Sequence, residues 1–402
     1  MTSFDTSPHL NVWRTLLALA VVFVMLATTG WTALRNQRGT TALEASVAAW
    51  QHGRIDGRRL PDAASAPARL ARFFASLGEG QRLALAHRFP LAVGNMNGAP
   101  VRLRYRANRF ALEAARAGER ERTHDRRLTP AGQREARRRA DRYTALLNPS
   151  RNVLAFDPAG AGKVAEVFGD LDRADRVSVV VPGVDTGLLT FQRTHRAHSA
   201  PVGMARSLYA AERTAGPATR TAVIAWADYV SPAGLGIEAA TATRAERGAL
   251  RLNALLRALP GTGPVALFCH SYGSVVCGLA ARTAPSRVTD IAVAGSPGMR
   301  ADNAARLRTA ARVWAMRDAD DWIEDVPNLE VGGLGHGADP VSPAFGARVL
   351  SARDARGHAG YFVPGTDSLR NFAAIGVGAY RSVDCARRSG ICREGLPVAT
   401  AS

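Results

Sequence analysis

Ser271 has the sequence surroundings of a catalytic nucleophile. It follows the apolar run 264–270 and precedes a stretch of small, apolar residues that begins after Ser274. A strand, a sharp turn bearing serine and a helix form a nucleophile elbow. The turn strains the serine backbone, so the residues two positions away must be small. Gly273 meets this requirement. Cys269 stands where glycine is usual, and it is small enough to be tolerated.

A serine nucleophile needs a carboxylate that orients its base, and the order along the chain should be serine, acid, histidine. Asp321 follows the apolar run 311–316 and precedes Trp322. The acid belongs after this strand, so we predict that Asp321 is the orienting group. Asp320 and Asp318 lie in the same turn and remain alternatives.

The general base is predicted to be His358, because it follows the last apolar run, 347–352. An imidazole held in one tautomer by a carboxylate can deprotonate a serine hydroxyl near neutral pH. His336 precedes that run and is the alternative, for which we expect a loop or rim position. His270, directly before the nucleophile, is expected to be structural.

Two backbone N–H groups must stabilise the oxyanion that forms when serine attacks an acyl carbon. One is predicted to be that of Tyr272, directly after the nucleophile. The other is expected from the loop after the run 176–183, where Gly183 and Val184 lie. Glycine permits the close backbone approach that this position needs.

The elements that position these residues are predicted from short apolar runs separated by helical patterns. Runs that are continuously apolar indicate strands buried on both faces, and strands alternating with helices indicate a mostly parallel, doubly wound α/β sheet. Ligands bind at the carboxyl ends of such strands. The runs are 152–156, 176–183, 220–227, 264–270, 288–295, 311–316 and 347–352.

Residues 15–34 contain no charged residue and are long enough to cross a bilayer as one helix. Trp13 and Trp31 lie near the two ends, as in an aromatic belt. A cleaved signal peptide is the alternative, but no clear cleavage site follows, so we predict a retained single-pass anchor. Arg35 and Arg38 favour a cytoplasmic C-terminal side, whereas an exported hydrolase would face outward; we expect an extracytoplasmic domain with the orientation left open.

These patterns divide the chain into four regions. They are a tail and anchor at 1–38, a helical accessory region at 39–150, an α/β catalytic domain at 151–380 and a C-terminal tail at 381–402. The helical region has apolar residues at helical spacing and an amphipathic helix after Thr129-Pro130. It holds no catalytic constellation.

The net charge of +18 suggests an anionic partner. Its basic residues are almost all arginine, with Lys163 the single lysine, and no nucleic-acid motif accompanies them. Anionic lipid is therefore the expected partner, and nucleic acid is not.

The four cysteines fall into two pairs. Cys269 and Cys277 lie in apolar stretches and are predicted to be buried small hydrophobes. Cys385 and Cys392 lie in a polar tail, where a local disulfide and two free thiols are both open.

Two further motifs are rejected. Residues 157–164 imitate a phosphate-binding loop, but Asp157 replaces its first glycine and Val164 its hydroxyl residue. A turn explains this segment better. His195 and His198 have no further metal ligands nearby in the sequence, so neither a metal nor an organic cofactor is expected.

The sequence resembles an actinobacterial α/β-hydrolase family that has long been catalogued as a domain of unknown function. The matching segments run in order from residue 93 to residue 371, and they include VVVPGVDTGLLTF, FCHSYGSVVCG, ARVWAMRDADDWI and GHAGYFVPGTDSLRN. The resemblance implies the α/β-hydrolase fold and a triad of Ser271, Asp321 and His358. It implies no substrate.

We therefore expect a membrane-anchored serine hydrolase that cleaves small-molecule or lipid carboxylic esters through an acyl-enzyme. Peptide and thioester cleavage stay open, because the triad does not encode the leaving group. The alternative is a catalytically silent α/β-hydrolase scaffold used for binding at the membrane, which a fold alone never excludes.

Overall fold

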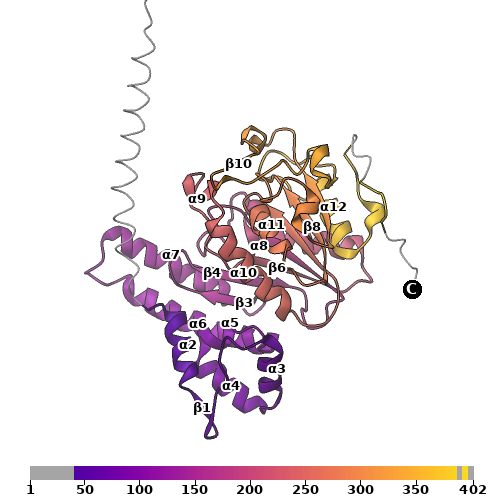
Figure 1. The fold of residues 1–402 in the computed structure, drawn as a ribbon. Coiled ribbons are helices and arrows are strands. Elements are labelled where there is room, and N and C mark those ends of the chain that lie inside the picture. Colours follow the sequence, from indigo (N-terminus) through magenta and orange to yellow (C-terminus); the bar gives the residue numbers. More distant parts are fainter. Residues whose placement is uncertain (1–39, 387–391, 397–402) are drawn as a thin grey trace, which may run out of the picture.

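A computed structural model describes residues 40–386 and 392–396. Its centre is an eight-stranded sheet in the order β12-β9-β8-β7-β5-β6-β4-β3 (Figure 1). Each of the seven predicted runs contains one strand of this sheet. The strands are β3 (Asn152–Asp157), β4 (Lys163–Phe168), β5 (Arg176–Val181), β6 (Thr221–Ala227), β7 (Val265–His270), β8 (Val288–Ala294), β9 (Arg312–Met316) and β12 (Arg348–Val349).

The sheet is mostly parallel, as predicted, from β6 through β12. Strand β4 pairs antiparallel with both β3 and β6, and the sequence patterns did not predict this strand. Only its first two residues, Lys163 and Val164, belong to the segment interpreted as a turn. Its apolar run is interrupted by Glu166, which is buried and forms an ion pair with Arg151.

Helices cover both faces of the sheet. On one face α8 and α12 contribute Leu208 and Phe372 to the same apolar core as Phe268 of β7. On the other face α10 and α11 contribute Leu252 and Val275. The helices of this part are α8 (Pro201–Ala215), α9 (Ile237–Ala240), α10 (Thr243–Ala258), α11 (Gly273–Ala281) and α12 (Asp367–Val377); short 3₁₀ helices are η2 (Ala197–Ser199), η3 (Ala304–Leu307), η4 (Trp322–Asp325), η5 (Pro343–Phe345) and η6 (Tyr380–Ser382).

The N-terminal helices form a second layer with a core of their own around Trp50, Phe74 and Phe89 (Figure 1). Asn108 joins this layer to the sheet by donating to the Val153 carbonyl oxygen at 3.0 Å. The elements are α2 (Ala42–Gln51), β1 (Arg54–Ile55), β2 (Arg58–Arg59), α3 (Pro67–Ala75), α4 (Glu79–Arg88), α5 (Pro90–Asn95), α6 (Val101–Arg122) and α7 (Pro130–Leu146). A second small hairpin, β10 (Glu330–Val331) and β11 (Leu334–Gly335), lies after η4.

The predicted membrane span at 15–34 lies outside the described residues. Within the described part of the chain, no helix is both long and apolar enough to cross a bilayer.

The prediction that Cys269 and Cys277 are buried small hydrophobes rather than a metal pair is confirmed as to burial, but it did not include the bond between them. Both are buried, but they form a disulfide between the end of β7 and the second turn of α11. The sharp turn at the intervening serine reverses the chain and brings their Cα atoms to 6.5 Å, within the range that a disulfide spans. Apolar surroundings predict that the two side chains are buried, but they do not predict this reversal of the chain.

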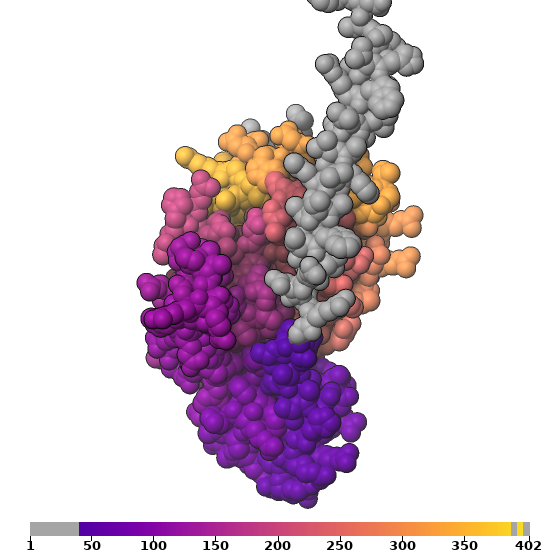
Figure 2. Space-filling view, turned by 90° about the vertical axis from the view of Figure 1, so that its left-hand side faces the viewer, coloured from indigo at the N-terminus to yellow at the C-terminus, as the bar shows by residue number. Residues whose placement is uncertain are grey.

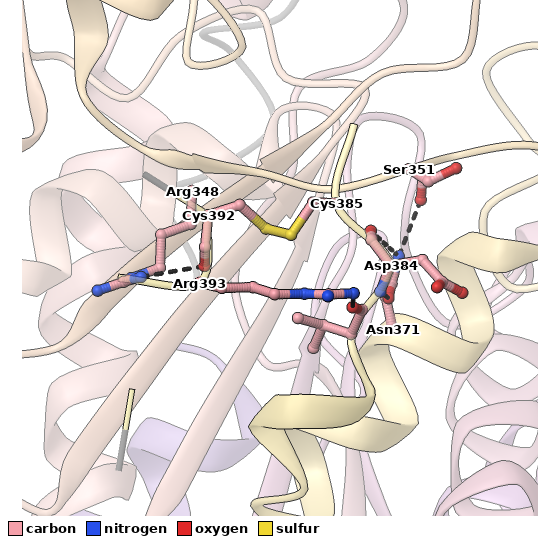
Figure 3. Close-up of a disulfide and its surroundings, with 8 residues drawn as sticks. Arg348, Ser351, Asn371, Asp384, Cys385, Cys392 and Arg393 are labelled. Atoms are coloured by element: carbon pink, nitrogen blue, oxygen red, sulfur yellow. Dashed lines mark hydrogen bonds between the residues drawn. A yellow bond between two sulfur atoms is a disulfide. The ribbon is translucent and has the colours of Figure 1, made fainter. Parts of the chain in front are cut away.

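A second disulfide joins Cys385 to Cys392 and so decides between the two possibilities left open for this pair (Figure 3). Arg348 of β12 donates to the Cys392 carbonyl oxygen at 3.0 Å. Asn371 of α12 donates to the Asp384 carbonyl oxygen at 3.1 Å. The bridge thus fastens the C-terminal segment to an edge strand and to a helix.

Glu212 of α8 is a buried carboxyl beneath the sheet. Burial raises its pKa from 4.5 to about 8, although the hydrogen bond with the Ser178 hydroxyl, at 2.5 Å, acts in the opposite direction. The native state therefore holds the proton of Glu212 at a pH where the unfolded chain has lost it.

We expect Glu212→Gln to stabilise the fold increasingly as pH rises. Between about pH 4.5 and 8 the unfolded wild type binds fewer protons at this group than the native state does, so wild-type stability falls with pH by at most about 1.4 kcal/mol per unit. Glutamine is neutral throughout and removes this loss. Urea unfolding at pH 5 and pH 8 measures the effect, and Glu121→Gln, at an exposed position on α6, is the control. An equal difference at both pH values would contradict it.

Candidate active site

Ser271 lies in the turn between β7 and α11, with a left-handed backbone (φ 55°). Its N–H donates to the Ala294 carbonyl oxygen at 3.0 Å, which ties the turn to β8. A Cβ on Gly273 would lie 2.2 Å from the Val181 carbonyl oxygen, so no larger residue fits two positions after the serine. This is the strained geometry of a nucleophile elbow.

The structure brings Ser271, His358 and Asp321 into one hydrogen-bonded line. His358 Nε2 lies 2.8 Å from Ser271 Oγ. Its Nδ1 lies 2.8 Å and 3.1 Å from the two carboxylate oxygens of Asp321. A proton on Nδ1 bonded to the carboxylate leaves Nε2 free to accept the serine proton. These contacts are the geometry of a nucleophile, a base and an orienting acid.

The Asp321 carboxylate is buried and remains ionised. Burial would raise its pKa, but hydrogen bonds from His358, Tyr361 and the Ile323 N–H outweigh burial and hold the pKa below its ordinary value. The two neighbouring acids lie elsewhere. Asp320 is exposed, and Asp318 accepts from the Gly357 N–H at 2.7 Å. Asp318 thereby shapes the loop that carries His358.

Two residues that support the acid were missed from the sequence. Tyr361 donates its hydroxyl hydrogen bond to Asp321 Oδ2 at 2.5 Å and accepts from the Asp318 N–H at 3.0 Å. Gly295, at the end of β8, approaches so closely that a Cβ there would lie 2.7 Å from Asp321 Oδ2 and 3.1 Å from His358 Nδ1. The only signals were that Gly295 ends a strand and that Tyr361 follows His358 by three residues.

We expect Tyr361→Phe to lower kcat about tenfold to a hundredfold, with KM nearly unchanged. The substitution removes one hydrogen bond to a buried carboxylate, a loss of about 1.5–3 kcal/mol that the imidazolium formed during turnover would feel. Ester hydrolysis with a parallel thermal melt measures it, and Tyr209→Phe, remote from the triad, is the control. A change in KM alone would contradict a positioning role.

The predicted oxyanion site lies beside the nucleophile. A Cβ on Gly183 would lie 2.7 Å from Ser271 Cβ and 3.0 Å from its Oγ, so the loop after β5 passes directly over the serine. Tyr229 fixes this loop by donating to the Pro182 carbonyl oxygen at 2.7 Å. Tyr272 is the N-cap of α11, where the first N–H groups have no intrahelical acceptor. Val184 is half-buried next to Gly183.

The two other histidines near the elbow are held away from the serine hydroxyl. Burial, together with the neighbouring His358, lowers the pKa of His270 to about 3, and its neutral Nε2 lies 2.6 Å from the His358 carbonyl oxygen. His270 thus supports the loop of the base. His336 lies in the loop after β11, one of the two positions expected for it, and it is buried. Its Nε2 lies 2.7 Å from the Ala239 carbonyl oxygen and its ring meets Tyr272 edge-on.

A cavity of about 600 Å³ opens at His358. Trp322, next to Asp321 in the chain, forms part of its wall and packs its ring 4.7 Å from the His358 ring. Arg196 and Arg356 also line it. The base therefore faces a space large enough for a small substrate group.

His198, one of the two histidines considered as a metal pair, lines the cavity at His358. His198 contacts the Ser207 hydroxyl at 2.7 Å. In residues 40–386 and 392–396, no group of three or more histidine, cysteine or acidic side chains is arranged to hold a metal ion.

Comparison with known proteins agrees with this fold. The α/β-hydrolase family model matches residues 157–331, a range that contains Ser271 and Asp321 and ends before His358. With the sheet topology and the elbow, this match supports an α/β-hydrolase domain and hydrolase chemistry.

Curated relatives of the chain come from mycobacteria. The uncharacterized protein Rv2079 of Mycobacterium tuberculosis is 26% identical over 377 residues, which cover 80% of this chain and 57% of that protein. The uncharacterized protein Rv0963c of the same organism is 30% identical over 178 residues, covering 42% of this chain and 66% of that protein. The chain thus spans little more than half the length of Rv2079.

Among solved structures, 2,6-dihydroxy-pseudo-oxynicotine hydrolase aligns with 83% of this chain and 93% of its own, at 10% identity and a TM-score of 0.36.

Proposed function

We propose that this chain is a membrane-anchored serine hydrolase that cleaves carboxylic esters through an acyl-enzyme. The observation that carries the proposal is the position of His358, in hydrogen-bond contact with Ser271 on one side and with Asp321 on the other. That arrangement is what a general base needs in order to activate a serine hydroxyl.

In the proposed reaction, Ser271 Oγ attacks the acyl carbon while its proton moves to His358 Nε2. The negative charge on the former carbonyl oxygen is stabilised by the Tyr272 N–H and by an N–H of the Gly183–Val184 loop. His358 then gives its proton to the departing alcohol oxygen as the acyl–oxygen bond breaks. Water, deprotonated by the same imidazole, then attacks the acyl carbon. The bond between this carbon and Ser271 Oγ breaks, the acid leaves, and Oγ takes the proton back from His358 Nε2.

The anchor is the second part of the proposal, and it is supported by composition alone. Residues 15–34 are uncharged and of bilayer length, flanked by Trp13 and Arg35. We propose that this run tethers the hydrolase to a membrane and that the catalytic domain faces the extracytoplasmic side.

Labelling with a fluorophosphonate tests the proposed chemistry. Ser271 Oγ should displace fluoride from phosphorus, and the adduct should map to the peptide that contains this serine. Ser274→Ala, a buried neighbour that bonds only weakly to the Cys269 carbonyl oxygen at 3.4 Å, is the matched control and should label like the wild type. Folded protein that does not label would favour the silent scaffold.

A further inference from the structure

Exposed apolar side chains are concentrated in two segments of the described chain. In the described residues nine large hydrophobic side chains are exposed, and seven of these lie within residues 230–237 and 322–334. We call these seven the apolar rim. Its members are Val230, Leu235, Ile237, Trp322, Leu329, Val331 and Leu334, of which Val331 is the most exposed at 69%.

The apolar rim borders the candidate active site. Its segments follow β6 and β9, so they lie at the same carboxyl edge of the sheet as Ser271 after β7. A bridge between Thr241 and Leu334 joins the two segments, and α9 and β10 are neighbours in Figure 1. The Tyr272 hydroxyl, beside the nucleophile, donates to the Thr241 carbonyl oxygen at 2.9 Å.

Two acids beside the rim are paired with arginines, whereas Asp325 is exposed to solvent. Glu238 meets Arg244 at 2.6 Å, and Glu330 meets Arg300 at 2.7 Å. The surface at this edge therefore offers exposed apolar side chains among charged groups, of which Glu238 and Glu330 are paired. Soluble monomers rarely leave a large contiguous apolar patch in water, so such a surface indicates an apolar partner.

The entry point of the chain indicates which partner this is. Thr41 lines one hollow together with Pro158 and Gly160, in the turn before β4. Because β4 runs antiparallel to β6, this turn also lies at the carboxyl edge. In Figure 2, which faces the left-hand side of Figure 1, the indigo N-terminal residues lie in the lower part of the view and orange residues of the later sequence lie toward its top and right. Only six residues, 35–40, separate Thr41 from the apolar run 15–34, and they span about 20 Å at most.

We propose that the apolar rim docks on a lipid bilayer and that the active site takes acyl esters from it. The inference rests on the proposed function, since it names the substrate class of the same site. A bilayer that holds residues 15–34 would lie against the carboxyl edge, where the rim can insert its side chains among the lipids. Docking would depend mainly on apolar burial, because the rim consists of apolar side chains, and it should persist at high salt.

Kinetics on two substrates test docking. Full-length enzyme reconstituted in phosphatidylcholine vesicles is given either a long-chain acyl ester dissolved in the bilayer or water-soluble p-nitrophenyl acetate. We expect Val331→Ser/Leu334→Ser to lower kcat/KM about tenfold to a hundredfold on the bilayer ester, because the two substitutions together remove about 1.4–2.7 kcal/mol of apolar burial. Activity on the soluble ester should not change. Leu250→Ser, equally exposed but on α10, is the matched control.

Fluorescence quenching tests docking without turnover. Vesicles with brominated acyl chains quench tryptophan that contacts the lipid. The emission of the Trp322→Phe variant is subtracted from that of the wild type, and this subtraction leaves the signal of Trp322 and removes the signals of Trp13 and Trp31. We expect this emission to be quenched at low and at high salt. If the chain does not hydrolyse esters, both rates will be absent while the quenching of Trp322 persists.

Four results would overturn the docking proposal. Unquenched Trp322, or equal loss on both esters, would show that the rim meets no lipid. A wild-type dimer that the double variant turns into a monomer would assign the rim to a second copy of the chain. Faster hydrolysis of the soluble ester by the double variant would assign it to a covering segment of the chain itself.

Discussion

Replacing Ser271 with alanine is expected to lower kcat for a short p-nitrophenyl ester by about 10³-fold or more. The hydroxyl, 2.8 Å from His358 Nε2, is the only group of this residue that the proposed reaction uses. Alanine keeps the Cβ and so adds no strain to the left-handed backbone (φ 55°) beyond what serine bears. Initial rates and a thermal melt of the two proteins measure the change.

Ser274→Ala is the control for this substitution. It removes a hydroxyl three residues away, fully buried in the first turn of α11, and should leave kcat within a few-fold of the wild type. Comparable rates for Ser271→Ala and the wild type would remove Ser271 from the mechanism. If activity is lost and the melting temperature also falls strongly, the loss reflects unfolding. Fluorophosphonate labelling of the folded fraction then shows whether the folded variant lacks the nucleophile.

The sheet was largely predictable because its strands are buried on both faces. Runs such as 264–270 are continuously apolar, short and bounded by loops. In a chain where such runs alternate with helical patterns, this predicts buried strands rather than helices. Strand β4 was not predicted because its run of apolar residues is interrupted by a charged one. Its interior Glu166 is stabilised by Arg151, and a buried ion pair of this kind has no periodic signature.

Positions at strand ends carried the site prediction. Ser271, Asp321 and His358 each follow a strand that is parallel to its neighbours, and such strand ends converge on one edge. Three acids share one turn, and spacing alone does not separate them. The structure does so through side-chain direction: Asp318 points to the Gly357 N–H, Asp320 to solvent and Asp321 to the imidazole.

Contacts that depend on close approach were beyond the sequence. The disulfide between Cys269 and Cys277 depends on how tightly the elbow reverses the chain. Gly295 matters because β8 ends against Asp321, and Tyr361 because its loop folds back over the same carboxylate. Each is a relation between elements, so no local pattern of residue types marks it.

Asp321→Asn is expected to lower kcat by about 10⁴-fold, as an asparagine does in the Ser-His-Asp template. An asparagine amide that turns its NH₂ toward His358 Nδ1 would need an acceptor there, which moves the imidazole proton to Nε2. An Nε2 that already carries a proton does not take one from Ser271. The volume is unchanged, so burial and packing at this position should persist. Steady-state kinetics at fixed pH measures the loss.

Asp320→Asn separates this effect from a general change of charge in the turn. Its side chain is exposed and its backbone N–H, which bonds Asp318 at 3.3 Å, is retained, so we expect kcat within a few-fold of the wild type. If instead Asp320→Asn were the inactive variant, the orienting carboxylate would be one residue earlier and His358 would have to rotate away from Asp321. Equal, mild effects of both substitutions would mean that the imidazole keeps its tautomer without a carboxylate, and the triad would reduce to a serine–histidine pair.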